Sequence, residues 1–497
     1  MLKKLGVRAL IALSTLALPL ASVSGVAAVG PTGTYSSGIA CVNLGAAAAS
    51  IAITFYNADN GTAITTYSVP SSVAPKANVV LFTPSIPELP TSLQGSAVVS
   101  SDQQVACTAD AQRSDGTPGT VAQPARSSTS ESFDTAQAAS TLYAPQVQKT
   151  FGNATSGIYD SYVAVQNIES SAVTVTVSYV DRFGVAVVAA NETVQIPAQA
   201  SHYFYQSQNA FLPVGFVGSA KIAASDNTKK LAATVVLYND GTTVAKSQML
   251  SYNASGAGAS KLTIPQWQRN YYGYQSGTSI MNVGATTTTI TTTFTFPGPN
   301  VYTRVDTIGP LKVTSLYAPN IAQLAPVDAF AVNLRVGSAI IQTAPGGLIV
   351  ANANLRNDGA CTGTAVCPAI PANQVGVGGA LNSFTDGTAT TKAIVTRYPK
   401  ALGGEIINGG FTIVNSTGSA ATCDIEYVGS INQLGVVLPA NGIVSRYAPG
   451  VAGVVGGTQN PVSIVCTQPV FVSANTRSDL ATYNGDSVTS WNVVNLP

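Results

Sequence analysis

Charged side chains are scarce in this chain, and histidine is almost absent. Of its 497 residues only 9% are Asp, Glu, Lys or Arg, and one is His, whereas ordinary globular proteins carry charge on about a quarter of their residues. The 23 basic and 22 acidic residues leave a net charge of +1. Without a basic surplus the chain has no electrostatic footprint for nucleic acid and no polybasic patch for anionic lipid. We therefore expect neither of these partners.

Residue clusters for metal binding or acid–base catalysis are equally sparse. His202 has no Cys near it and no evident Ser or carboxylate partner, so neither a zinc site nor a hydrolytic triad is expected. Several Asp residues lie in or near loops but outside any run of alternating oxygen donors, which favours turn capping over calcium binding. These are Asp110, Asp115, Asp240, Asp358 and Asp479. We predict no metal, no cofactor and no enzymatic activity.

Long hydrophobic runs are missing too, except at the N-terminus. Lys3, Lys4 and Arg8 precede an apolar segment from Ala9 to Leu20, and small residues follow it. This order of basic, apolar and small residues is typical of a secretory signal peptide. We predict a cleaved signal peptide over residues 1–29 and a mature protein that is extracellular or held at the cell surface. The alternative, an uncleaved membrane anchor, is less favoured because the apolar run is short for a membrane span.

What the chain has instead is one pattern repeated four times. A strand-like segment ends in Asn, and an aromatic residue follows twelve positions later in every copy. The four pairs are Asn43 and Phe55, Asn167 and Tyr179, Asn282 and Phe294, and Asn415 and Tyr427. We interpret the four Asn residues as turn caps, like the Asp residues above. Each copy ends on a short polar turn that begins at Arg113, Tyr238, Arg356 or Arg477. Self-similarity at this spacing predicts a tandem array of one structural module.

Within a copy the pattern is that of short strands. In Val173–Tyr179 apolar and polar residues alternate with period two, and Thr286–Thr295 is nearly all Thr. Such segments predict half-buried antiparallel strands, and nothing after the signal peptide shows convincing helical periodicity. About seven short strands in each copy, separated by Gly, Pro, Asn and Asp, predict an immunoglobulin-like β-sandwich. We therefore expect an all-β protein with modules over residues 30–135, 136–255, 256–388 and 389–497.

Six Cys residues fall into local pairs inside these boundaries. A module that folds by itself favours Cys partners within it, so the expected disulfides are Cys41–Cys107, Cys361–Cys367 and Cys423–Cys466. Disulfides also agree with export, since they persist in oxidising compartments. The bridges of the two terminal modules close long loops, and we expect them to constrain the unfolded chain more than the short third bridge does.

The second copy carries the segment Leu212–Ala220, which reads Leu-Pro-Val-Gly-Phe-Val-Gly-Ser-Ala and follows an alternating strand. This succession resembles the tandem β-sandwich modules of secreted cell-envelope proteins from filamentous Chloroflexota-type bacteria. The resemblance extends over the mature chain, implies a surface or matrix role and carries over no catalytic residue. The fourth copy departs from it, because Asn460, Pro461 and Val462 stand where the other copies have Gly-Ser-Ala.

The two ends of the chain suggest a mode of assembly. The later copies open with a strand that contains or ends in Pro, at Pro145, Pro265 and Pro399, and the first copy has no such strand outside the signal peptide. The C-terminal segment has this opening pattern but no module after it. We predict an assembly strand, formed by Trp491, Val493, Val494 and Leu496, that completes the first module of the next molecule. The alternative is that this strand folds back as the last strand of its own module.

Together these expectations describe a non-enzymatic extracellular subunit that polymerises into a surface filament, sheath or surface layer. Head-to-tail addition would propagate such a filament if the rotation between subunits does not close a ring. The alternative is a secreted adhesin that binds cell-envelope or environmental glycans. In that case Tyr271, Tyr272 and Tyr274 could stack on sugar rings, although clusters of Tyr also pack between modules.

Overall fold

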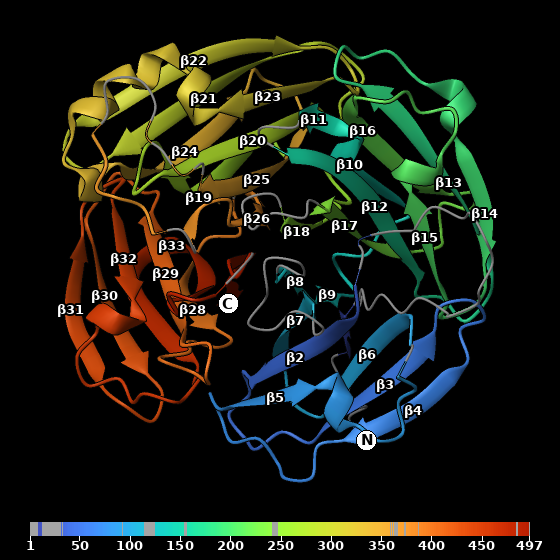
Figure 1. Ribbon diagram of the computed structural model, residues 1–497, viewed down its shortest axis with the longest axis horizontal. Coiled ribbons are helices and arrows are strands. Elements are labelled where there is room, and N and C mark those ends of the chain that lie inside the picture. Colours follow the sequence, from blue (N-terminus) through green and yellow to red (C-terminus); the bar gives the residue numbers. More distant parts are fainter. Residues whose placement is uncertain are drawn as a thin grey trace.

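The computed structural model of this chain is built almost entirely of antiparallel strands (Figure 1), which confirms the all-β expectation. It describes residues 8–11, 31, 33–91, 93–113, 125–153, 157–240, 247–357, 359, 361, 366–371, 374–385, 387–483 and 486–496. The predicted cleavage zone and the turn residues Asp115 and Asp358 lie outside these ranges. In the part of the chain that is described, no helix is both long enough and apolar enough to cross a membrane.

Each module has two sets of strands, one on either side of its core. In module 1 the first sheet has the order β4-β3-β6-β1-β9 and the second the order β5-β2-β7-β8. Its strands are β1 (Arg8–Ile11), β2 (Tyr35–Asn43), β3 (Ile51–Asn57), β4 (Ala63–Ser68), β5 (Asn78–Phe82), β6 (Gly95–Ser101), β7 (Val105–Arg113), β8 (Ser127–Glu131) and β9 (Phe133–Asp134).

Module 2 repeats this arrangement with the sheets β10-β16-β13-β14 and β11-β12-β17-β18, and β15 lies beside β12. Its strands are β10 (Thr141–Lys149), β11 (Phe151–Asn153), β12 (Gly157–Asn167), β13 (Val173–Asp181), β14 (Glu192–Ile196), β15 (Ser201–Tyr205), β16 (Phe216–Ala224), β17 (Leu231–Asp240) and β18 (Ser247–Asn253).

Module 3 has the sheets β22-β21-β24-β19-β27 and β23-β20-β25-β26. Its strands are β19 (Lys261–Gln268), β20 (Tyr274–Asn282), β21 (Thr288–Phe296), β22 (Asn300–Ile308), β23 (Val313–Tyr317), β24 (Val336–Thr343), β25 (Ile349–Asn357), β26 (Gly378–Asn382) and β27 (Phe384–Thr385). The 3₁₀ helices within the described residues are η1 (Thr83–Ser85), η2 (Val188–Ala190), η3 (Gln206–Gln208), η5 (Ala318–Asn320), η6 (Ala322–Ala329), η7 (Val332–Leu334) and η9 (Ala448–Gly450).

Module 4 differs in one respect, because its two sets of strands share a single long strand. Its strands are β28 (Thr390–Val395), β29 (Ile407–Asn415), β30 (Ala421–Tyr427), β31 (Asn432–Leu438), β32 (Ile443–Tyr447), β33 (Val462–Ser478), β34 (Thr489–Asn492) and β35 (Val494–Leu496). In the other modules the corresponding segment is two strands with a short loop between them, such as β24 and β25. Val462 still pairs with Tyr427 and Val395, so the loss of Gly-Ser-Ala leaves the strand pairing intact.

The strand-end Asn has the same role in all four modules. Its side-chain oxygen accepts the backbone N–H two residues later, and its amide donates to the carbonyl four residues later. The amide also donates to a carbonyl more distant in the sequence, that of Val73, Ile196, Ile308 or Pro439. All four Asn residues are fully buried. The interpretation of these residues as turn caps is therefore confirmed, and the aromatic residues twelve positions later are buried in the module cores.

All three expected disulfides are present, at Cys41–Cys107, Cys361–Cys367 and Cys423–Cys466. In both terminal modules the two Cys residues are directly opposite each other in neighbouring strands of one sheet. The bridge of an antibody domain joins its two sheets instead. These bridges therefore link adjacent strands of one sheet, and not the two sheets of a sandwich.

The four modules form a closed circle around a common centre, with the C-terminus near that centre (Figure 1). An apolar cluster joins each module to the next: Val98 meets Ala232, Tyr143 meets Met281, and Phe384 meets Phe471. The circle closes because Ile394 of module 4 packs against Val42 and Ala106 of module 1. One head-to-tail type of interface thus closes after four copies within a single chain.

Four equivalent residues line the centre of this circle. Glu131, Asn253, Asn382 and Asn492 stand at matching register positions of β8, β18, β26 and β34. Asn253 and Asn382 exchange two hydrogen bonds, the Asn253 amide also donates to the Glu131 carbonyl, and the Asn492 N–H donates to the Glu131 carboxylate. Each of these four strands is therefore bonded to the equivalent strand of a neighbouring module.

A buried carboxylate adds a further link at the same place. Asp486 accepts hydrogen bonds from the backbone N–H groups of Met249 in module 2, Gly378 in module 3 and Val488 in its own module. Its own N–H donates to the carbonyl of Ala125 in module 1. Burial raises the pKa of Asp486 well above its usual range, and the three N–H donors and Arg356 oppose that rise. Through its side chain and its backbone N–H, this single residue hydrogen-bonds to all four modules.

The C-terminal strand lies inside its own module, as the fold-back alternative expects. Thr489–Asn492 pairs with β33 and Val494–Leu496 pairs with β28. Trp491 is completely buried in the module 4 core. The segment therefore corresponds to the closing strands β8, β18 and β26, and not to an opening strand as its sequence pattern suggested. Donation of this strand to a second molecule stays a prediction, and it would require extraction of Trp491 from that core.

The opening strand of module 1 also differs from the sequence-based expectation. Arg8–Ile11 occupies this place between β6 and β9, as β19 does between β24 and β27 in module 3. These residues belong to the segment predicted to be a signal peptide. A copy that seemed to lack an opening strand is therefore completed here by the N-terminal segment.

Candidate ligand-binding cavity between modules 2 and 3

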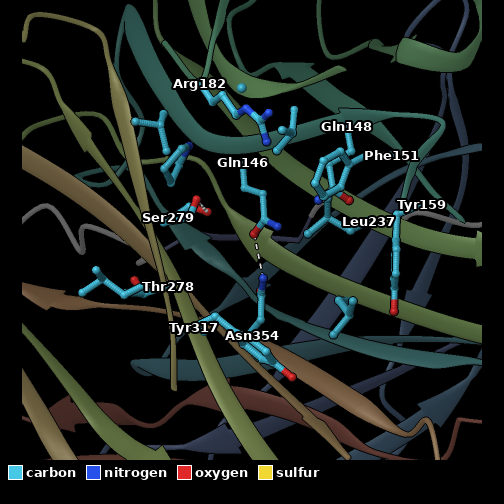
Figure 2. Close-up of a pocket in the computed structure, with 18 of the residues that line it drawn as sticks. Gln146, Gln148, Phe151, Tyr159, Arg182, Leu237, Thr278, Ser279, Tyr317 and Asn354 are labelled. Atoms are coloured by element: carbon cyan, nitrogen blue, oxygen red, sulfur yellow. Dashed lines mark hydrogen bonds between the residues drawn. The ribbon is translucent and has the colours of Figure 1, made fainter. Parts of the chain in front are cut away.

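A cavity of about 610 Å³ opens where module 2 meets module 3. One wall is formed by β10 and β12 with parts of β16, β17 and β18, and the other by β20, β23 and β25. Because the two walls come from different modules, the cavity exists only when the modules are docked. Figure 2 shows Gln146 near its middle, with Thr278, Ser279 and Tyr317 on one side and Gln148, Phe151 and Tyr159 on the other.

A β-bulge in the opening strand places the central amide. The register between β10 and β16 shifts between Ala144 and Val147, which re-aims the intervening side chains. The Gln146 side-chain oxygen accepts hydrogen bonds from the amides of Asn352 at 2.9 Å and Asn354 at 2.7 Å. Figure 2 shows the bond to Asn354. This network joins the two modules and leaves a polar surface between them.

Two further amides that line the cavity have hydrogen-bonding capacity left over. Gln148 and Gln248 are 5% and 1% exposed. The Gln148 Oε1 and Gln248 Nε2 atoms make no hydrogen bond to any part of the chain that the structure describes. A buried amide that remains unpaired costs about 1 to 3 kcal/mol.

Aromatic and basic side chains complete the lining. Phe151, Tyr159, Phe183 and Tyr317 supply apolar ring surface. Arg356 donates a hydrogen bond to the Tyr159 hydroxyl at 2.9 Å, and its guanidinium lies 5.8 Å from the centre of the same ring. The remaining basic residues of the lining are Arg182 and Lys312.

The chemistry of the cavity favours binding. Its described lining contains amides, hydroxyls, aromatic rings and three basic residues, but no Asp, Glu, His or Cys. Carboxylate, imidazole and thiol groups are the usual carriers of acid–base and nucleophilic catalysis. Nowhere in the described ranges do three His, Cys, Asp or Glu residues gather closely enough to hold a metal ion. The arrangement suits a ligand held by hydrogen bonds and ring contacts.

The tyrosines predicted for glycan stacking lie elsewhere. Tyr274 is buried against Leu355, Val377 and Val488, so it packs between modules 3 and 4, as the alternative interpretation of these residues expected. Tyr271 contacts Tyr272 edge-on, with ring centres 4.9 Å apart, and Tyr272 is the exposed member of the group. His202 makes an edge contact with Phe204, and burial lowers its pKa.

Sequence reasoning missed the cavity because none of its polar residues stands out in the chain. Gln146 belongs to the opening strand of module 2, where it directly follows Pro145, and Gln266 follows Pro265 in the same way in module 3. Of these two residues, only Gln146 lines the cavity. The sequence offered one signal, an amide that recurs after Pro, but it did not identify the surface that this amide faces.

No protein-family model matches this chain, and no curated protein matches it significantly. Among solved structures, Thermotoga maritima 1070 is 8% identical, covers 23% of this chain and 92% of its own, and has a TM-score of 0.20. A tetra-tandem repeat in the extending region of a large adhesion protein is 12% identical and covers 92% and 94%, with a TM-score of 0.12. The BSP domain of a biofilm-associated protein is 9% identical and covers 94% and 91%, with a TM-score of 0.11. Likenesses at these TM-scores carry no argument about function.

Proposed function

We propose that this protein is an extracellular surface protein of the adhesin type, and that it binds a saccharide in the cavity between modules 2 and 3. The observation that carries this proposal is the lining of that cavity, where spare amide groups and aromatic rings converge. Its volume of about 610 Å³ lies within the usual range of small-ligand pockets.

The chemistry of sugars fits this lining. A sugar ring presents many hydroxyl groups, each of which both donates and accepts hydrogen bonds. An amide side chain also offers a donor and an acceptor, and Gln148 and Gln248 keep an unpaired oxygen and an unpaired nitrogen, respectively. The apolar faces of a sugar pack on aromatic rings, as Tyr159 and Tyr317 would allow.

An extracellular location is supported by the cysteines and by the N-terminal sequence. All six Cys residues are in disulfides and none is free. Disulfides persist in oxidising compartments, and residues 1–29 have the pattern of a signal peptide. A low content of charged residues is compatible with this location but does not specify it.

The closed circle of modules favours binding over polymerisation as the main activity. The surfaces that would join molecules head to tail are used between modules 4 and 1 of the same chain. The strand predicted for donation is paired within module 4. A filament or surface layer would therefore need further contacts on the outer faces of the circle.

The test is saccharide binding by the purified chain that begins at Gly30, measured on a glycan array and then by calorimetry. We expect a 1:1 complex that is lost in Gln148→Ala. The matched control is Gln268→Ala, because Gln268 occupies the same position in module 3, is equally buried and lies outside the cavity. Absence of binding to any saccharide by a folded, monomeric protein would sink the proposal. Filaments in electron micrographs of the same sample would favour the structural role.

A further inference from the structure

The charge of the cavity is one-sided although the chain as a whole is nearly neutral. Arg182, Lys312 and Arg356 line the cavity without any Asp or Glu, whereas the chain has 23 basic and 22 acidic residues. We propose that the ligand is an acidic saccharide whose carboxylate binds between Arg182 of module 2 and Lys312 of module 3. This inference rests on the proposed saccharide-binding function.

Arg182 lies in the turn after β13, with its guanidinium 4.8 Å from the centre of the Phe183 ring. Figure 2 shows this side chain on the opposite side of Gln146 from Tyr317 and Asn354. The adjacent Asp181 carboxylate accepts the backbone N–H groups of Phe183 at 2.9 Å and Val185 at 2.8 Å. That carboxylate therefore holds the turn in shape, and it is not among the residues that line the cavity.

Lys312 lines the cavity from module 3. It directly precedes β23 and follows Leu311, whose left-handed backbone (φ 57°) turns the chain at this point. The turn that carries Arg182 approaches Lys312 closely, since a Cβ built on Gly184 would lie 3.3 Å from the Lys312 Cβ. Two basic residues from different modules thus flank one opening of the cavity.

Neither of these two side chains is neutralised by the protein. In the described residues, no ion pair joins Arg182 or Lys312 to a carboxylate, while other basic groups are paired, such as Arg397 with Asp110 and Arg269 with Asp328. Arg356 differs, because it bonds Tyr159 and acts electrostatically on Asp486. The charge available for a ligand is therefore that of Arg182 and Lys312.

A sugar that carries a carboxylate matches both the basic residues and the amides of the cavity. The planar guanidinium of Arg matches a carboxylate with two parallel hydrogen bonds, and such charge-assisted bonds are stronger than neutral ones. The amides of Gln146, Gln148 and Gln248 then face the hydroxyl groups of the same sugar. A uronic acid unit carries both kinds of group on one ring.

The experiment compares three oligosaccharides of equal length by calorimetry: a galacturonate oligomer, the neutral galactose oligomer and a sulfated galactose oligomer. We expect the galacturonate oligomer to bind about tenfold more tightly than the neutral one, which corresponds to one charge-assisted hydrogen bond. Arg182→Gln and Lys312→Gln should each remove most of this difference. Lys230→Gln is the control, because Lys230 is an exposed residue of module 2 outside the cavity.

The outcomes separate this inference from the function on which it rests. The proposal that the ligand is acidic is overturned if neutral and acidic oligomers bind equally. It is also overturned if Lys230→Gln loses as much affinity as Arg182→Gln. Both outcomes leave the proposed saccharide site in place. Tighter binding of the sulfated oligomer than of the galacturonate would overturn the proposal that the acidic group is a carboxylate. If none of the three binds while thermal unfolding shows a folded protein, both proposals fail.

Discussion

The boundary between modules 2 and 3 and the boundary between modules 4 and 1 are built from the same strands but with different chemistry. At equivalent positions the first has Gln146 bonded to the Asn354 amide at 2.7 Å, and the second has Arg397 paired with Asp110 at 2.6 Å. The Arg397 guanidinium also lies 5.4 Å from the centre of the Trp491 ring. The boundary with the amide pair contains the cavity, whereas the boundary with the ion pair closes the circle.

The centre of the molecule shows the same contrast. Between modules 2 and 3, Asn253 and Asn382 exchange two hydrogen bonds. Between modules 4 and 1, the Asn492 N–H donates to the carboxylate of Glu131. The comparison indicates that equivalent positions of one scaffold carry either paired amides, at the boundary with the cavity, or an ion pair, at the boundary that closes the circle.

The largest expected effect comes from breaking the closing ion pair. Arg397→Ala leaves Asp110 unpaired at a site where the two side chains are only 12% and 18% exposed. We expect a loss of about 3 kcal/mol in the free energy of unfolding, together with separation of modules 4 and 1. Denaturant unfolding and small-angle scattering measure the two effects.

The control for this change is the same truncation at the boundary between modules 2 and 3. Gln146→Ala removes two neutral hydrogen bonds and should cost only about 1 to 2 kcal/mol. If both variants lose the same stability and neither expands, then charge does not distinguish the two boundaries.

The second prediction concerns pH. Burial raises the pKa of Glu131 to about 7 from 4.5, and the hydrogen bond from the Asn492 N–H only partly offsets this rise. Below pH 4.5 the carboxyl is protonated in both the folded and the unfolded chain. As pH rises toward 7 the unfolded chain ionises first, so stability falls, and the full cost is present above pH 7.

Glu131→Gln removes this ionisation and keeps a side-chain oxygen for Asn492. We expect this variant to be more stable than the parent protein at pH 8, by up to about 3 kcal/mol, and nearly equal to it at pH 4. Unfolding curves across this range measure the difference. A difference in stability that stays constant across this range would show that Glu131 does not titrate between pH 4 and pH 8.

The third prediction converts one boundary into the other. Gln146→Arg with Asn354→Asp places the closing ion pair in the cavity, so we expect saccharide binding to be abolished while stability changes by less than about 1 kcal/mol. The matched control is Gln266→Arg with Asn475→Asp, the equivalent pair of positions between modules 3 and 4. Binding that survives the first double substitution would remove the cavity from consideration as the site.

The smallest expected effect compares modules 1 and 2 at their opening strands. A chain that begins at Gly30 lacks β1, so β6 loses a neighbour, whereas β16 keeps β10. We expect backbone amides of β6 to exchange hydrogen faster than those of β16, at a cost of about 1 kcal/mol in stability. Equal protection of both strands would show that another segment takes the place of β1.

Much of the fold was predictable because it depends on local pattern. The period-two alternation of Val173–Tyr179 predicted a half-buried strand, and this segment lies in β13 with its Val side chains buried. The strand-end Asn residues were correctly interpreted as turn caps, since an Asn side chain bonds backbone groups only a few positions away. The disulfide pairs followed from module boundaries.

The cavity and the closed circle could not be predicted in this way. The alternation of apolar and polar residues shows which side chains point into the module core. It does not show which residues of another module the outward-facing side chains contact. Gln146 bonds a residue 208 positions away, and Arg397 a residue 287 positions away. The C-terminal segment was given the wrong place in the module for a related reason, because opening and closing strands have similar short apolar patterns and only their pairing partners distinguish them.

The sequence by itself determined the strands, the fourfold repetition, the caps and the disulfide pairs, because each of these depends on residues within one module. Only the tertiary structure decided that four modules close on themselves and that one of their boundaries contains a cavity. Those properties depend on the rotation from one module to the next and on pairs of outward-facing side chains far apart in the chain. No local pattern of residues encodes either.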